Sequence, residues 1–173
     1  MGQRIRAALV DLALILGWIV LVAAVGVPLY LTGVTAGLRP LQLNLVGAAL
    51  VVVPVVAGLA ATEGGRYEAS PGKQWAGLRV RRLDGGRLRY GRSLLRNAVK
   101  VGLPWVVGHA AAIALATSTD PVGADVWILT AVAYLLPLAY LVGALLDHGR
   151  APYDVVAGSQ VVVTAAGRRV AED

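Results

Sequence analysis

Two charged residues near the N-terminus are spaced so that both fall on one face of a membrane helix. Arg4 precedes a long apolar segment, and Asp11 lies seven residues further on, inside it. On an α-helix this separation is two turns, or about 10.5 Å of rise. A carboxylate inside a membrane is costly unless it has a partner, and such residues commonly mark ion or proton paths. Asp11 is therefore the first candidate for chemistry, as a carboxylate that binds an ion or a proton.

Arg4 and Asp11 lie beyond the three- or four-residue spacing at which helical side chains meet, so each needs a partner elsewhere. We expect Asp11 to pair with a basic residue of another segment, with Arg96 as the best candidate, and Arg4 to pair with Asp154. Two interpretations of this network remain open. Either it only pins the first apolar segment to a loop and the tail, or burial against an arginine tunes Asp11 for ion or proton binding.

The composition is that of a membrane protein. Of the 173 residues, 57% are hydrophobic and 15% are charged, whereas soluble domains average about 25% charged residues. The absence of cysteine excludes disulfides and thiolate metal sites, and two histidines far apart make a zinc site improbable. No catalytic triad or glycine-rich phosphate loop occurs. We therefore expect neither a cofactor or metal ion nor enzymatic activity.

Four apolar segments have about the 20 residues needed to cross a bilayer. They cover residues 7–31, 43–61, 99–116 and 126–146. With no internal repeat and no second soluble domain, residues 1–173 are expected to form a single all-α membrane domain. Four short spans would need homo-oligomerisation to enclose a path through the membrane.

The distribution of basic residues predicts the orientation. Ten lysines and arginines lie in residues 62–100, while the other two connections between spans hold one between them. Because basic residues accumulate on the cytoplasmic side, both termini, the loop 62–98 and the tail 147–173 are expected in the cytoplasm of a cell-membrane protein.

The basic loop contains the pattern of a small β-hairpin. Residues 78–83 and 87–90 alternate around the turn signal Asp84-Gly85-Gly86, and the strand-like run 159–164 has the pattern to pair with them. From residue 93 an amphipathic helix leads into the third span.

The basic side chains of this loop are expected to face anionic lipid headgroups, at about 1 kcal/mol for each residue near the surface. They are Arg79, Arg81, Arg82, Arg87, Arg89, Arg92 and Lys100. Nucleic acid is not expected as a partner, because the aromatic platform that commonly stacks bases is missing.

Several motifs taken in order resemble those of the RDD family, which is named for one arginine and two aspartates. The trio corresponds to Arg4, Asp11 and Asp154, and the resemblance extends over the loop run 71–80, Asp84-Gly85, Arg96-Asn97 and Ala157-Gly158-Ser159. This chain departs from the usual pattern in having Tyr153, where a histidine commonly precedes the second aspartate, and Ser159, where threonine is common. The resemblance implies an integral membrane protein and, for some members, transport that includes cation–proton exchange.

Two functions are compatible with these observations. The first is a small transporter or cation/proton exchange component that uses Arg4, Asp11, Asp154 and Arg96. The second is a non-transporting scaffold or accessory protein whose charged residues are structural and whose basic loop binds anionic lipid or a partner.

Overall fold

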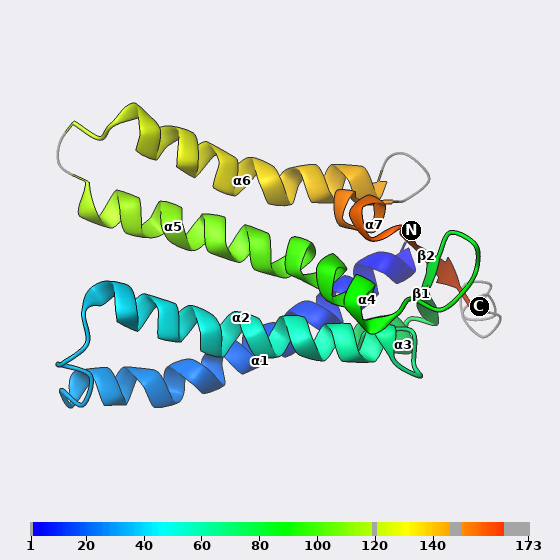
Figure 1. The fold of residues 1–173 in the computed structure, drawn as a ribbon, viewed down its shortest axis with the longest axis horizontal. Coiled ribbons are helices and arrows are strands. Elements are labelled where there is room, and N and C mark those ends of the chain that lie inside the picture. Colours follow the sequence, from blue (N-terminus) through cyan, green and yellow to red (C-terminus); the bar gives the residue numbers. More distant parts are fainter. Residues whose placement is uncertain (1, 119–120, 146–149, 165–173) are drawn as a thin grey trace.

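The computed structural model describes residues 2–118, 121–145 and 150–164, and four long helices run side by side through it (Figure 1). Each is long and apolar enough to cross a membrane. They are α1 (Gly2–Leu31), α2 (Pro40–Gly64), a third span built from α4 (Tyr90–Asn97), the π-helix η1 (Ala98–Gly102) and α5 (Leu103–Thr117), and α6 (Ala124–Leu145). The predicted all-α membrane fold is confirmed. Residue 146 and the tail segments 147–149 and 165–173 lie outside the described residues.

The helices extend further than the apolar runs that predicted them. Helix α1 begins at Gly2 and so includes Arg4, and α2 continues past Ala61 to include Glu63. At these ends the helices carry ionisable side chains that bind to other elements. This pairing allows each helix to continue beyond its apolar run.

The buried core lies at one end of the bundle. Along α1 only Ala7 and Asp11 are buried, and most apolar side chains of the spans face outward, as lipid-facing residues do. At the end where α1 begins, α3 (Pro71–Trp75), α7 (Pro152–Ala157) and two strands close over the helices (Figure 1). Leu78, Val80 and Leu88 are almost fully buried there.

The two strands form an antiparallel sheet between the loop and the tail. Strand β1 (Leu78–Arg82) pairs with β2 (Ser159–Val163), with Val80 opposite Val161. The predicted turn forms, since the amide of Arg82 donates to the carbonyl of Gly86. The returning arm, however, contributes only a bridge between Arg81 and Arg87, because Leu88 turns into the core. The tail therefore supplies the second strand.

The third span contains the π-helix η1, which ends two residues before Pro104. In a π-helix the amide of residue 104 would donate to the carbonyl of Val99, but proline has no amide hydrogen. The hydroxyl of Tyr140, on α6, donates to that carbonyl instead, at 2.8 Å. This bond ties α6 to the third span one residue before Lys100.

Candidate functional site: a buried charged network beside a cavity

Five ionisable side chains from five helices meet at the closed end of the bundle. They are Asp11 on α1, Glu63 on α2, Lys73 on α3, Arg96 on α4 and Asp154 on α7, and all are buried. A buried charge is stable only when it is paired and its hydrogen bonds are made. The contacts of each carboxylate therefore decide what this cluster can do.

Asp11 caps helix α3 from outside. Its Oδ1 accepts a hydrogen bond from the amide of Gly72 at 2.8 Å, and its Oδ2 accepts one from the hydroxyl of Ser70 at 2.6 Å. Ser70 occupies the N-cap position of α3 but makes no side-chain cap to its own helix. Asp11 thus takes the capping role that Ser70 would normally fill, and a carboxylate there is favoured by the helix dipole.

Lys73 lies between two carboxylates. Its Nζ is 2.7 Å from Glu63 Oε1 and 3.8 Å from Asp11 Oδ2, and it also donates to the hydroxyl of Ser70 at 3.1 Å. The lysine is therefore bound closely to α2 and more loosely to α1.

Arg96 joins the other two carboxylates through the two sides of its guanidinium group. Nη1 donates to Glu63 Oε2 at 2.7 Å, while Nε and Nη2 each lie 2.8 Å from Asp154 Oδ1. Asn97 adds a bond to Glu63 Oε2 at 2.9 Å. The carboxylate of Asp154 also accepts hydrogen bonds from the hydroxyl of Ser159 at 3.0 Å and from the amide of Ala151 at 3.3 Å.

The four residues predicted for the site line one cavity, but their partners differ from the predicted ones. The cation on Asp154 is Arg96, and the cation on Asp11 is Lys73. Arg4 donates from Nη2 to the carbonyl of Val161 at 3.0 Å, which ties the start of α1 to β2. The planar guanidinium group of Arg96 contacts two carboxylates at once, whereas the prediction gave this arginine a single partner.

Sequence reasoning missed Glu63 and Lys73 as members of this network. A signal for Glu63 existed, because it is the sole acidic residue between Pro40 and Gly64 and stands at the end of an apolar run. Lys73 was counted among the basic residues of the loop. Nothing in its local pattern distinguishes it from the arginines that follow, since its partners lie on α1 and α2.

The predicted lipid-facing residues fall into four groups. Arg79, Arg81 and Arg87 gather around Glu68, at 3.8, 2.7 and 3.1 Å from its carboxylate oxygens. Arg82 pairs with Asp84 at 2.7 Å. Arg89 and Arg92 are exposed, whereas Lys100 lines the cavity.

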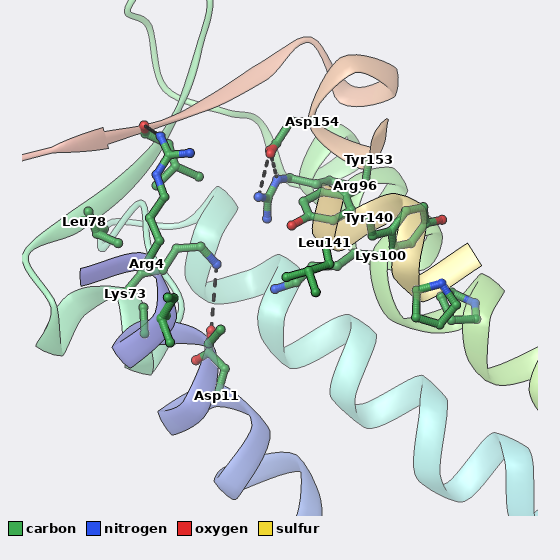
Figure 2. A pocket seen from close by; sticks show the side chains of 16 residues that line it. Arg4, Asp11, Lys73, Leu78, Arg96, Lys100, Tyr140, Leu141, Tyr153 and Asp154 are labelled. Carbon is green, nitrogen blue, oxygen red and sulfur yellow. Dashed lines mark hydrogen bonds and ion pairs between the residues drawn. The ribbon is translucent and has the colours of Figure 1, made fainter. Parts of the chain in front are cut away.

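The cavity beside the network has a volume of about 360 Å³. It lies between α1 on one side and the third span and α6 on the other (Figure 2). Its walls combine charged residues of the network with apolar ones. The apolar part includes Ile5, Ala8, Pro104, Pro137 and Leu141.

Tyr153 stands where the cationic side chains approach the cavity. Its ring centroid is 5.0 Å from the guanidinium carbon of Arg96 and 5.9 Å from Lys100 Nζ, and Tyr140 meets it edge-on at 5.3 Å. Burial, with a further contribution from the neighbouring Asp154, raises the pKa of Tyr153 to about 12. Its hydroxyl therefore remains protonated at neutral pH and can donate a hydrogen bond.

Four apolar helices closed at one end by a charged network define an integral, multi-pass membrane protein. The sequence model of the RDD family matches residues 1–158, and the chain belongs to this family. No curated protein and no solved structure matches the chain at a significant level.

Proposed function

We propose that this protein is a small transport component of the cell membrane, with both termini and the basic loop in the cytoplasm. The observation that carries the proposal is the position of Lys73 between Asp11 and Glu63 at the edge of a cavity among membrane helices. Ionisable groups inside membrane proteins commonly belong to ion or proton pathways.

In this proposal Lys73 is an internal cation that an incoming ion replaces at Asp11. The contact to Asp11 is the longer one, at 3.8 Å against 2.7 Å to Glu63. A proton or metal cation that binds Asp11 takes over the role of Lys73 there, and the lysine remains on Glu63. Cation–proton exchange then consists of alternate occupation of Asp11 by the two ions. The cavity lies at one end of the spans, so a second copy of the chain or a movement of the helices would complete the path.

A structural role is the second candidate, and a specific observation favours it. Both oxygens of Asp11, Glu63 and Asp154 contact donors from the described residues. A network satisfied in this way holds five helices together without any solute. The protein would then be a membrane scaffold whose basic loop binds lipid or a partner.

Ion-driven pH change in proteoliposomes distinguishes the two functions. Sodium or potassium gradients are imposed in both directions on wild type, on Asp11→Asn and on Asp84→Asn. The last is a matched control, because Asp84 has the same chemistry on an exposed turn, with its side chain 55% exposed. Exchange predicts proton movement that Asp11→Asn abolishes and Asp84→Asn retains, at equal amounts of folded protein. Absence of proton movement in wild type, with a lower melting temperature of Asp11→Asn, would contradict exchange and support the scaffold.

A further inference from the structure

We propose that the cavity between α1 and α6 binds an amphipathic anion, namely the phosphate-bearing headgroup of an anionic membrane lipid, with Lys100 as its principal contact. This inference concerns binding, and it holds whether or not the protein moves ions.

The first argument is the state of Lys100. In the described part of the chain its Nζ makes no ion pair or hydrogen bond, and it lies 5.9 Å from the centroid of the Tyr153 ring. The cations of the network differ in this respect, because Lys73 and Arg96 are both paired with carboxylates. A lysine among membrane helices keeps its proton best when a counter-charge lies beside it. The side chain reaches into the cavity toward the side where Asp11 and Lys73 lie (Figure 2).

The second argument is the charge balance around the cavity. The charged residues at its wall and in the adjoining network are Arg4, Lys73, Arg96 and Lys100 against Asp11, Glu63 and Asp154. Lys73 and Arg96 already occupy the three carboxylates, so Lys100 has no carboxylate partner among the described residues. An anion complements this lysine, and a metal cation does not.

The third argument is the shape and polarity of the walls. Ile5 on α1 and Leu141 on α6 line the cavity and are 52% and 56% exposed, so the cavity opens toward the lipid-facing surface. A free inorganic anion would contact only the charged part of the cavity wall. A lipid would contact both parts of the wall. Its phosphate would lie at Lys100 and the hydroxyl of Tyr153, and its acyl chains would lie along the apolar residues. A volume of about 360 Å³ lies within the range of about 300–1,000 Å³ typical of small-molecule sites.

The experiment measures lipid retention by native mass spectrometry of the purified chain. It is titrated with phosphatidylglycerol and, separately, with phosphatidylcholine carrying the same acyl chains. We expect one tightly retained phosphatidylglycerol for each chain, about fivefold weaker retention in Lys100→Gln, and no change in the control Arg39→Gln, in line with about 1 kcal/mol for one basic residue. Arg39 is a suitable control because it is exposed and lies in the connection between α1 and α2, outside the basic loop.

Two further variants test the charge and the apolar wall separately. Lys100→Arg retains the charge and should retain the lipid, while Ala8→Leu narrows the apolar wall at an exposed position and should weaken lipid binding. Equal retention of the two lipids, or equal loss in Lys100→Gln and Arg39→Gln, would overturn the proposal. Displacement of phosphatidylglycerol by an equal concentration of inorganic phosphate would assign the site to a free phosphate and overturn the lipid part.

Discussion

Asp11 Oδ1 lies 2.8 Å from the amide nitrogen of Gly72, and this bond requires glycine at position 72. A Cβ on residue 72 would collide with the carbonyl oxygen of Ala7 and lie 2.8 Å from the Asp11 carboxylate. The start of α3 therefore approaches the backbone of α1 as closely as the chain permits. The first aspartate of the family trio and a loop glycine 61 positions away form one structural unit.

Gly72→Ala should separate α3 from α1. The added methyl group meets backbone on one side and the capping carboxylate on the other, so we expect a loss of about 1–3 kcal/mol, as for an overpacked core. Thermal unfolding in detergent measures the loss as a lower melting temperature. Gly91→Ala is the matched control, since a Cβ there meets nothing within 4 Å. An unchanged melting temperature in Gly72→Ala would show that α3 can move away from α1 without loss of stability.

The pair Lys73 and Glu63 should be strongly coupled. Removing either partner leaves a buried charge with fewer partners, so Lys73→Met and Glu63→Gln are each expected to destabilise, and the double variant by less than their sum. We expect a coupling of about 2 kcal/mol from a double-mutant cycle of unfolding free energies.

The exposed pair of Arg82 and Asp84 is the control for this cycle. Its nitrogen–oxygen distance of 2.7 Å equals that of Lys73 and Glu63, but exposed pairs contribute about 1 kcal/mol or less. Equal coupling in the two cycles would contradict the idea that burial makes the network strong.

The long helices could be predicted from the sequence, because a run of about 20 apolar residues has few alternatives in a membrane. The partners within the site could not. Asp11 has a hydroxyl and an amide as its closest donors, and both lie at the start of a short helix far along the chain. The predicted pairing of the tail run 159–164 with the loop is confirmed, whereas the predicted full hairpin within the loop is wrong, because its alternating pattern does not indicate that Leu88 is buried. Local periodicity predicts elements, whereas the side-chain partners within the site arise only when distant segments meet.

Arg96→Lys should loosen the tail although the charge is kept. A lysine ammonium is a point charge and cannot hold Glu63 and Asp154 with the separate sides of a planar group. We therefore expect α7 and β2 to detach more often from α4. Hydrogen–deuterium exchange of peptides from residues 150–164 should become at least several-fold faster.

Arg89→Lys provides the comparison for Arg96→Lys, because Arg89 is exposed. It should leave exchange in this segment unchanged. If residues 150–164 exchange at the wild-type rate in both variants, the guanidinium contacts of Arg96 with Glu63 and Asp154 do not hold this segment in place.

Tyr153 should make the protein sensitive to alkaline pH. Its pKa in the folded protein is raised from 10.0 to about 12, so the folded state binds the phenolic proton more tightly than the unfolded state. The resulting stability is fully present below pH 10 and is lost as the pH rises toward 12. Melting temperatures across this interval should fall less steeply for Tyr153→Phe than for wild type. Tyr134→Phe, at a position 77% exposed, should follow wild type.

The orientation proposed from the basic loop can be tested with single cysteines, because the chain contains none. Leu83 lies in the basic loop and Leu38 in the connection between α1 and α2, and their side chains are 54% and 41% exposed. In intact cells a membrane-impermeant maleimide should label Leu38→Cys, while Leu83→Cys should react only after permeabilisation. Since neither substitution changes charge, the positive-inside balance is preserved. The reverse labelling pattern would place the charged network and its cavity on the outer side, and ion entry would then begin from outside the cell.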